Sequence, residues 1–430
     1  MNLIIHRGTH EIGGSCVELT SGNTRIIIDL GIPLVDKKKE KFDAKILKGK
    51  TVPQLKELGV LPPVQGLYRG EDKAVDAIFL SHCHLDHYGL LNYVHPDIPV
   101  HMSDGSRRLI EASNIFLPSK AEGFKTTVIK NRETTSIGDF EVTVRLVDHS
   151  AFDAMAFIVQ SGKKKLFYSG DFRAHGRKGW LFEDMIRHPP RSIKCLLMEG
   201  TVLGRGKERF LTEEDVETDL VKALNDKKDI MFFFASSQNI DRLVSAYKAC
   251  HQSGTTFVID IYTAFVLHSL KNVCEKLPQY NWKNVRVKYF KSHADSLSKT
   301  QYKNLLYKFN SSKIEIDEIV RNRKKILMIL RDNALFPIML KELHDTAGTT
   351  VIYSMWKGYL KEKFVAFCKE KGIKILHIHT GGHATRQDLK RFANALKPQT
   401  LIPMHTFEPE RFRELYKSVR ILDDEEVFEI

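Results

Sequence analysis

The stretch Ile78-Phe-Leu-Ser-His-Cys-His-Leu-Asp-His87 constrains this chain more than any other part of it. An apolar run predicts a buried strand over residues 77–80, and it is followed directly by His82, His84, Asp86 and His87. Buried imidazoles and carboxylates need partners, and a metal ion satisfies several of them at once. His82 and His84 point the same way from an extended backbone, whereas the other two residues lie past the turn, so one loop can serve two neighbouring ions. The alternative, a polar loop with scattered histidines, fits this spacing poorly.

Length and composition are those of an ordinary globular protein. The chain has 430 residues, enough for two domains, with 42% hydrophobic and 28% charged residues. Its N-terminus begins directly in an expected strand without a signal-peptide pattern, and no run approaches the ~20 apolar residues of a membrane span. The six cysteines are dispersed and contain no CxxC pair, which is typical of reduced thiols. We therefore expect a cytoplasmic protein that does not bind a membrane.

The formal net charge of +13 favours a polyanionic partner, and nucleic acid first. The densest basic runs are Lys37–Lys39, Lys163–Lys165 and Arg321–Lys325. Each of them could equally be a solvated turn, because many basic proteins carry lysines with no partner. Charge alone therefore leaves the partner open.

The pattern of expected elements changes twice along the chain. Short strands with turn signals dominate as far as residue 205, and from Thr212 capped helices alternate with short apolar strands. This alternation predicts a parallel sheet flanked by helices, that is, a second domain. The last part returns to ligand-like residues, with a strand leading to a glycine turn and another strand ending in His405. We therefore predict a first domain over residues 1–207 and 374–430, interrupted by an inserted domain over residues 208–373.

The His-x-His-x-Asp-His spacing resembles the signature of the metallo-β-lactamase fold. That family has an Asp ending an upstream strand, an isolated His downstream and a further Asp at a strand end. This chain matches these three features with Asp29, His149 and Asp171. The resemblance implies that Asp29 braces the histidine loop through hydrogen bonds instead of binding metal.

The inserted domain and the C-terminal motifs sharpen the resemblance to the β-CASP branch of this fold, which includes ribonuclease J and the cleavage factor of mRNA 3′-end processing. The family marks are an acidic residue ending a strand, a His in a Gly-His-Ala-like turn and a late His after Pro. They fall here on Glu199, His383 and His405. The implied fold class is α/β, a metallo-β-lactamase αββα sandwich core with an inserted β-CASP α/β domain. Ribonuclease J usually carries a further C-terminal domain, so a homo-oligomer stays open for this chain.

Carried over residue by residue, the resemblance implies two divalent metal ions. His82, His84 and His149 hold one, Asp86, His87 and His405 hold the other, and Asp171 bridges them. The imidazole-rich set favours Zn²⁺, with Mn²⁺ as the alternative. Iron-binding relatives usually have Glu at the position of His84.

The catalytic residues implied in the same way are Asp86, Asp171, Glu199 and His383. Two cations that share a water make hydroxide at neutral pH and neutralise charge on a phosphoryl oxygen. His383 then protonates the leaving 3′ oxygen or stabilises the pentacovalent phosphate, and Glu199 fixes its tautomer. The alternative for His383 is a purely structural turn residue.

Two segments are expected to bind the substrate phosphate. Where a strand leads into a helix, the first resembles the family's Ser-Asn-x-x-Arg segment, and its candidates are Ser236, Ser237, Asn239 and Arg242. The second is the turn formed by Thr380, Gly381 and Gly382. Gly381 replaces the usual Ser, and Thr406-Phe407 replace the Gly-Glu of ribonuclease J. Because of these two departures, the family's 5′-end sensing and direction of exonuclease action are not carried over to this chain.

The sequence thus predicts a metal-dependent nuclease for single-stranded RNA, acting as an exonuclease, an endonuclease or both. In this family, His at the position of His405 accompanies RNA substrates, whereas Val at that position accompanies DNA substrates. The first alternative is a DNA nuclease of the same fold. A small-molecule thioester or lactone hydrolase is opposed by the insertion, Glu199, His383 and the basic charge. A metal-binding scaffold without turnover is opposed by the complete ligand set.

Overall fold

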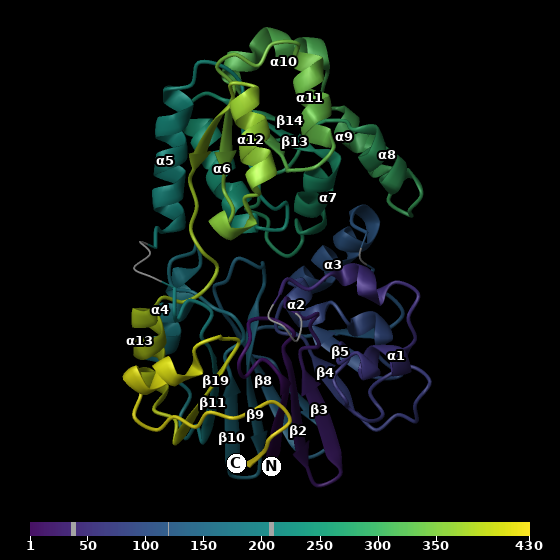
Figure 1. Cartoon of the computed structure of the whole chain (residues 1–430), viewed down its shortest axis with the longest axis vertical. Helices are drawn as coiled ribbons and strands as arrows, with labels where there is room; N and C mark the ends of the chain where they lie inside the picture. The colour runs from purple at the N-terminus through teal and green to yellow at the C-terminus, as the bar shows by residue number, and fades with distance from the viewer. Residues whose placement is uncertain (36–39, 119, 206–209) are drawn as a thin grey trace. The chain divides into compact units, whose positions relative to one another are not determined.

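The computed structural model describes residues 1–35, 40–118, 120–205 and 210–430. The basic run Lys37–Lys39 lies outside these described residues. The chain forms two compact units (Figure 1). Unit 1 contains residues 1–110, 119–208 and 382–430, and unit 2 contains residues 111–118 and 209–381.

Unit 1 is built on two sheets. The first has the strand order β20-β1-β2-β3-β4-β5-β6, antiparallel from β20 to β3 and parallel from β3 to β6. Its strands are β1 (Asn2–Arg7), β2 (Cys16–Ser21), β3 (Thr24–Ile28), β4 (Ala77–Phe79), β5 (Pro99–Met102), β6 (Lys125–Val128) and β20 (Val427–Glu429).

The second sheet has the order β19-β11-β10-β9-β8-β7. Its strands are β7 (Thr134–Ile137), β8 (Phe140–Leu146), β9 (Met155–Ser161), β10 (Lys164–Tyr168), β11 (Cys195–Glu199) and β19 (Thr400–Met404). The three strands β10, β11 and β19 run parallel, so their carboxyl ends meet at one edge of the sheet.

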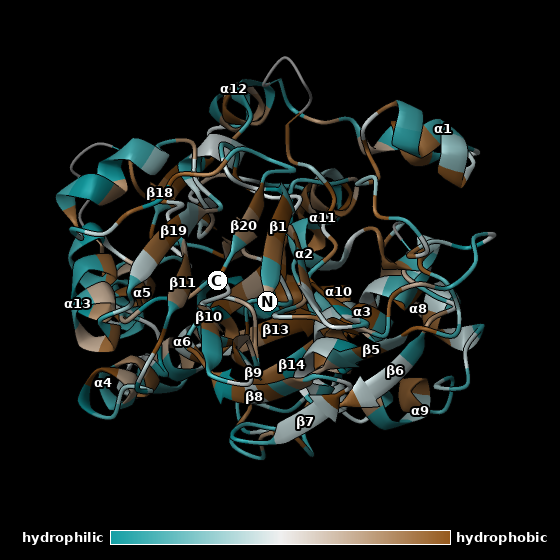
Figure 2. Ribbon diagram, turned by 90° about the horizontal axis from the view of Figure 1, so that it is seen from below, coloured by the Kyte–Doolittle hydropathy of each residue, from teal (hydrophilic) through white to brown (hydrophobic). Residues whose placement is uncertain are grey.

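The core of unit 1 lies between the two sheets. Alternate residues of the strands point into it, for example Ile26 and Ile28 from β3 and Val142 and Val144 from β8. The rings of Phe79 and Phe157, one from each sheet, meet edge to face with centroids 5.7 Å apart. Burying each such side chain stabilises the fold by about 1.5–3 kcal/mol. Most of these strands are hydrophobic in Figure 2, whereas the Thr-rich β6 and β7 are pale.

Helices cover the outer faces of this sandwich. Phe167 points from β10 away from the core and meets Phe392 of α13, with ring centroids 5.6 Å apart. Thr385 caps α13 by accepting a hydrogen bond from the backbone N–H of Asp388, as expected for a helix starting at this residue. The helical segments of unit 1, with α3 extending into unit 2, are α1 (Val52–Glu57), α2 (Leu85–Tyr88), α3 (Asp104–Phe116), α4 (Gly179–Arg187), α13 (Arg386–Leu396) and the 3₁₀ turns η1 (Ala44–Leu47), η2 (Leu91–Tyr93) and η5 (Pro409–Glu414).

Unit 2 contains a sheet of the order β15-β14-β13-β16-β12-β17-β18, in which all described pairs are parallel. Its strands are β12 (Met231–Phe234), β13 (Thr256–Asp260), β14 (Val285–Lys288), β15 (Lys313–Ile314), β16 (Ile326–Leu330), β17 (Thr350–Tyr353) and β18 (Lys374–His377). β12 and β16 are apolar and fully buried because helices cover both faces of the sheet.

The helical segments of unit 2 are α5 (Glu213–Asn225), α6 (Ile240–Gln252), α7 (Ile261–Ser269), α8 (Lys291–Ser298), α9 (Leu305–Asn310), α10 (Ile316–Asn322), α11 (Leu335–Leu343), α12 (Glu362–Glu370) and the 3₁₀ turns η3 (Arg323–Lys325) and η4 (Lys357–Tyr359). The predicted fold class, a sandwich core with an α/β insertion around a parallel sheet, is confirmed. Within the described part of the chain, none of the helices combines the length and apolar character that crossing a bilayer would need.

One expectation about the domain boundary differs from the structure. The strand at residues 374–377 was expected to return the chain to the first domain, but β18 pairs with β17 in unit 2, placing His377 beside Tyr353. Unit 1 resumes only at Gly382. The side-chain pattern of a four-residue strand does not indicate which sheet the strand will join, so the sequence could not predict the pairing of β18 with β17.

Candidate metal centre

All seven predicted metal ligands lie at or shortly after the carboxyl ends of strands of unit 1. β4 ends at Phe79, and the chain then passes through the histidine loop into the single turn of α2. Three further ligands follow the ends of β8, β10 and β19, and these are His149, Asp171 and His405. This arrangement brings together residues that are more than 300 positions apart in the sequence, as in the 3.3 Å contact between Asp86 and His405.

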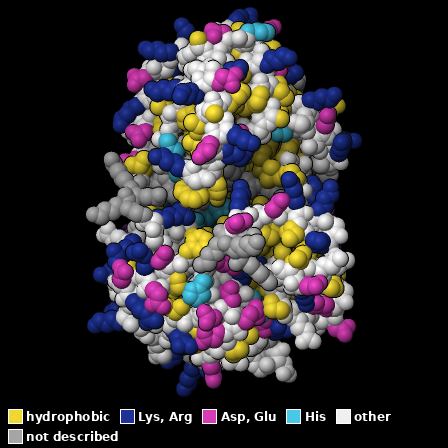
Figure 3. Space-filling model, viewed as in Figure 1, with side chains coloured by type: hydrophobic (Ala, Val, Ile, Leu, Met, Phe, Trp, Pro, Cys, Tyr) yellow, Lys and Arg dark blue, Asp and Glu magenta, His cyan; other side chains and the backbone are white. Residues whose placement is uncertain are grey.

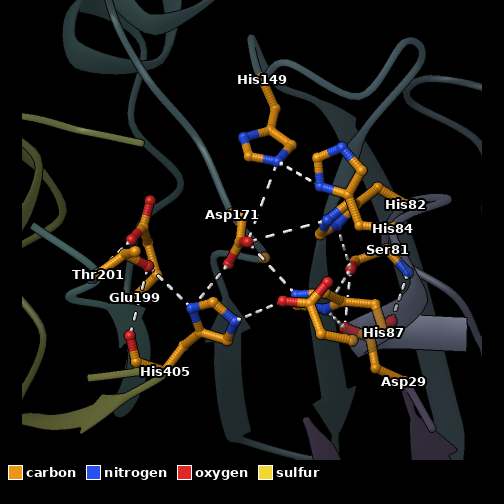
Figure 4. Close-up of polar contacts among 12 residues, drawn as sticks. Asp29, Ser81, His82, His84, His87, His149, Asp171, Glu199, Thr201 and His405 are labelled. Carbon is orange, nitrogen blue, oxygen red and sulfur yellow. Dashed lines mark hydrogen bonds and ion pairs between the residues drawn. The ribbon is translucent and has the colours of Figure 1, made fainter. Parts of the chain in front are cut away.

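Among the described residues the possible donor atoms form four groups, and two of these groups contain six of the predicted ligands without sharing a residue. In the first, donor atoms of His82, His84 and His149 lie within 4.8 Å of one another. The second, held to the same limit, consists of Asp86, His87 and His405. These are the two sets of three that the family resemblance implies. Figure 4 shows the imidazoles converging on a common centre.

Asp171 lies between the two groups. Its Oδ2 is 3.3 Å from His87 Nε2, 3.8 Å from His82 Nε2 and 4.0 Å from His149 Nε2. Its Oδ1 is 3.7 Å from His405 Nδ1. One carboxylate therefore faces both sets of imidazoles, which is the placement that a bridging ligand requires (Figure 4).

The chemistry of these donors fits a divalent cation. Burial lowers the pKa of the His82 and His149 imidazoles well below the usual value, helped by neighbouring imidazoles, and burial lowers that of His84 to about 4. Neutral imidazole is the form that binds metal. In addition, Nε2 of His82 and Nε2 of His87 are buried with no hydrogen-bond partner among the described residues. Leaving such an atom unsatisfied costs about 1–3 kcal/mol, which a bound cation would relieve.

Asp29 holds the histidine loop in place. Its fully buried carboxylate accepts hydrogen bonds from the Ser81 backbone N–H and Ser81 Oγ, both at 2.7 Å, and from Tyr168 Oη at 2.6 Å. It also accepts one from His87 Nδ1 at 2.8 Å, which leaves His87 Nε2 facing Asp171. The geometry is that of the predicted brace. Ser81 and Tyr168 are not among the residues predicted from the sequence, although the position of Ser81 inside the motif is a usable signal.

Thr201 is a third residue of the site that is not among those predicted from the sequence. Its Oγ1 lies 2.8 Å from His405 Nδ1, and its backbone N–H donates to Glu199 at 3.0 Å. His405 Nε2 therefore faces Asp86. His405 has a backbone φ of 52° and Asp29 one of 60°, in the left-handed region that residues with side chains seldom adopt. Such backbone strain tends to concentrate at functional sites.

His383 and Glu199 lie beside the metal ligands. Glu199 is buried, and its Oε1 is 3.3 Å from His383 Nδ1. His383 Nδ1 is also 3.7 Å from Asp171. Burial alone would lower the pKa of His383, but the carboxylates of Glu199 and Asp171 outweigh it and raise that pKa. The imidazole therefore carries a proton more readily than a free histidine.

The predicted phosphate-binding residues have varied surroundings. Arg242 is fully buried, and its guanidinium donates to Glu213 at 3.1 and 3.2 Å, to Ser354 O at 2.8 Å and to Thr380 O at 3.0 Å. A substrate phosphate could reach it only by breaking these bonds. Ser237 is likewise buried, with its Oγ 2.5 Å from Thr263 Oγ1.

The other members of that predicted set differ in exposure. Ser236 is exposed, Asn239 caps α6 by accepting from the Arg242 N–H, and Thr380 contacts Leu211 O. Gly381 is partly exposed. Gly382 O accepts a hydrogen bond from His149 Nδ1 at 2.5 Å, and a Cβ on Gly382 would lie 2.3 Å from Ser150 Oγ. Gly382 therefore orients the predicted ligand His149, and its contact with the substrate phosphate stays a prediction.

Comparison with known proteins agrees with this geometry. Residues 51–225 match a family profile described as "Beta-lactamase superfamily domain", and residues 372–426 match one described as "Zn-dependent metallo-hydrolase RNA specificity domain". The chain is 23% identical to ribonuclease J of Sinorhizobium meliloti over 82% of its own length. It is also 23% identical to ribonuclease J of Mycoplasma genitalium over 93% of its length. The chain belongs to the ribonuclease J-like β-CASP family of the metallo-β-lactamase fold.

This β-CASP protein spans 61% of the Sinorhizobium meliloti relative and 66% of the Mycoplasma genitalium relative. Its fold is also that of a crystal structure of a protein of unknown function from Enterococcus faecalis. The TM-score is 0.81 and the identity 21%, and the match covers 99% of each chain. The β-CASP protein and the Enterococcus faecalis protein thus share one fold along nearly their whole lengths.

Proposed function

We propose that this β-CASP protein is a metal-dependent hydrolase that cleaves phosphodiester bonds in single-stranded RNA. The observation that carries the proposal is the convergence of six buried or partly buried donors in two groups around Asp171, with His383 and Glu199 alongside. The names of the relatives and the RNA specificity profile support RNA as the substrate. DNA is the alternative that the experiment below decides.

The donor set would hold two divalent cations, Zn²⁺ first and Mn²⁺ as the alternative. His82, His84 and His149 would take one, Asp86, His87 and His405 the other, and Asp171 both. When bound, such a pair supplies hydroxide at neutral pH and neutralises charge on the phosphoryl oxygens.

The protein's own contribution is to hold and deliver a proton. Glu199 holds His383 Nδ1 at 3.3 Å, so the proton available for transfer sits on Nε2. A protonated imidazole can donate that proton to the 3′ oxygen leaving the phosphate, and general acid catalysis of this kind contributes about 10²–10⁴-fold to a rate. The Phe172 N–H donates to Glu199 at 3.3 Å, which links the general acid to the loop carrying Asp171.

We further infer that the protein acts on its substrate in the cytoplasm and does not bind a membrane. All six cysteines are free thiols in the structure, as a reducing compartment requires.

The positive charge is spread out, since Lys and Arg side chains are dispersed among Asp and Glu on the face shown in Figure 3. Light scattering of the purified protein tests whether it forms a homo-oligomer.

The test of the function uses purified protein loaded with Zn²⁺ or Mn²⁺. Matched RNA and DNA oligonucleotides, together with circular RNA and RNA bearing 5′-phosphate or 5′-hydroxyl ends, are incubated separately and the products sized. We expect cleavage of RNA that is abolished in His84→Ala and Asp86→Ala. His188→Ala, which removes an exposed histidine of unit 1, is the matched control and should cleave like the wild type.

Two results would contradict the proposal. Undiminished cleavage by His84→Ala and Asp86→Ala would show that the metal centre does not perform the reaction. Faster cleavage of DNA than of RNA would replace the proposed substrate by DNA. Cleavage of circular RNA would identify an endonuclease, and products appearing only from 5′-phosphate ends a 5′ exonuclease.

A further inference from the structure

Two large aromatic side chains lie exposed on the loop that follows β17 in unit 2. Trp356 is 41% exposed and Tyr359 61% exposed, and they stand with ring centroids 5.3 Å apart at an interplanar angle of 88°. We call these two residues the aromatic pair. Two adjacent exposed aromatic rings offer apolar surface that a partner can cover.

The loop sets the position of both rings. The Trp356 ring lies directly against the backbone of Gly358, where a Cβ would come within 2.2 Å of a ring carbon. The turn is closed by hydrogen bonds from Tyr359 N to Trp356 O at 3.0 Å and from Leu360 N to Lys357 O at 2.9 Å. The rings are therefore positioned before any partner arrives, which lowers the entropic cost of binding.

The base of the loop is tied into the sheet. The Ser354 N–H donates to Phe234 O of β12 at 2.9 Å, and Ser354 Oγ donates to Ile378 O at 2.6 Å. Buried Arg242 donates to Ser354 O at 2.8 Å. The aromatic pair thus stands on a rigid foundation at the carboxyl edge of the parallel sheet, where ligands of α/β folds commonly bind.

The charge around the aromatic pair is positive. Lys357, Lys361 and Lys363 are exposed within the same short segment, which contains a single acid, Glu362. Lys361 is 66% exposed and lies 2.8 Å from Asp332. Aromatic rings among lysines are typical of surfaces that bind single-stranded nucleic acid, whereas protein interfaces are depleted in lysine.

We propose that the aromatic pair is a base-stacking platform for single-stranded RNA. A nucleobase stacks on the exposed face of Trp356 or Tyr359, and the neighbouring lysines attract the phosphates on either side. The platform rests on the proposed function and extends it, because it assigns an RNA contact outside the metal centre. Stacking of this kind tolerates any base, so the platform contributes affinity without sequence preference.

The test measures RNA affinity of the metal-loaded protein. A fluorescein-labelled 2′-O-methyl RNA is titrated and followed by anisotropy, beside a matched strand whose bases are replaced by abasic sites, and a gel of each end point shows that the strands are intact. We expect Trp356→Ala to weaken binding of the intact strand about tenfold and to leave binding of the abasic strand unchanged. Trp356→Phe should restore most of the affinity, because the ring and not the indole N–H carries the contact.

The control is Trp180→Ala, which removes another exposed tryptophan, 63% exposed and located on α4 of unit 1. It should bind both strands like the wild type. Unchanged circular dichroism of each variant shows that its fold is intact, as expected for exposed side chains.

Three outcomes would overturn the platform. The first is wild-type affinity in both Trp356→Ala and Tyr359→Ala, and the second is an equal loss on intact and abasic strands. The third is a change of molar mass in light scattering with RNA affinity retained, which would make the aromatic pair an interface between two copies of the chain. Wild-type protein that binds RNA through the platform but cleaves none would overturn the proposed function alone.

Discussion

The carboxylate of Asp148 lies 3.4 Å from the guanidinium of Arg173, and both side chains are fully buried. Asp148 directly precedes the predicted ligand His149, and Arg173 follows Asp171 by two positions. The Arg173 N–H also donates to Asp148 O at 2.7 Å, and a Cβ on Gly176 would collide with both side chains. This ion pair therefore ties together two loops that each carry a predicted metal ligand.

Replacing Asp148 by Asn should destabilise the protein strongly. The change removes the buried negative charge that faces the Arg173 guanidinium at 3.4 Å and Lys178 Nζ at 3.6 Å, and breaking a buried ion pair in this way costs about 3–5 kcal/mol in the free energy of unfolding. Urea denaturation of the apoprotein measures this loss, and metal titration should show weaker binding because the two loops are no longer tied. Arg132→Gln is the control, since it breaks a surface pair of similar length, 3.4 Å to Asp184, with Arg132 70% exposed. Its cost should stay below about 1 kcal/mol, and equal costs for both variants would contradict the assignment.

Replacing Asp29 by Asn should weaken metal binding without removing any ligand. The variant keeps the shape of the side chain but loses the charge that orients His87 through Nδ1. Loss of such a supporting residue lowers metal affinity by about 10–100-fold. Competition with a chromogenic chelator measures the affinity for Zn²⁺. Asp76→Asn, which alters an exposed carboxylate accepting the Arg25 N–H at 2.8 Å, should bind Zn²⁺ like the wild type. An unchanged affinity in Asp29→Asn would show that the brace has no effect on the centre.

Replacing His383 by Ala should separate catalysis from metal binding. The proposed general acid supplies about 10²–10⁴-fold to the rate, so kcat on RNA should fall by this factor. The predicted ligands are untouched, so elemental analysis should find the same metal content as in the wild type. Loss of metal together with activity would instead identify His383 as a ligand, consistent with its place in a group with Asp171, Glu199 and His405.

The contribution of Glu18 to stability should depend on pH. Burial would raise the pKa of this carboxyl, but hydrogen bonds from His6 at 2.8 Å and from Arg25 at 2.6 and 2.9 Å outweigh it and lower the pKa from 4.5 to about 2. The ionised form is thus favoured in the folded state. Its stabilisation, about 3 kcal/mol, is fully present above pH 4.5 and is lost progressively as the pH falls toward 2.

The measurement compares the wild type with Glu18→Gln by urea unfolding at several pH values. The difference in free energy of unfolding should be constant from pH 7 to pH 5 and should shrink by about 1.4 kcal/mol per pH unit below 4.5. A difference that stays constant down to pH 3.5 would show that the interaction does not depend on the charge of Glu18.

The seven candidate metal ligands could be selected from the sequence because they follow recognisable apolar strands, and their role as ligands stays a prediction. The hydroxyl groups of Ser81, Tyr168 and Thr201 could not be assigned in this way. Hydroxyl side chains are common on strands and turns, and only the folded structure shows which of them meets a ligand.

The role of Arg242 illustrates a different limit. Its position at the start of a helix indicates anion binding, but its carboxylate partner Glu213 comes from the start of another helix, α5. A buried ion pair between two helices leaves no local pattern in the sequence. For the same reason the sheet that β18 joins could not be predicted from its own four residues.

The left-handed backbone of His405 governs how substrate choice can be examined by mutation. Exchanging this residue for Val, as in DNA-acting members of the family, would force a β-branched side chain into a conformation with φ near 52°. The resulting steric penalty, about 1–2 kcal/mol, would be confused with any change in preference between ribose and deoxyribose. Asn adopts this conformation readily, so His405→Asn changes the predicted metal ligand without adding backbone strain.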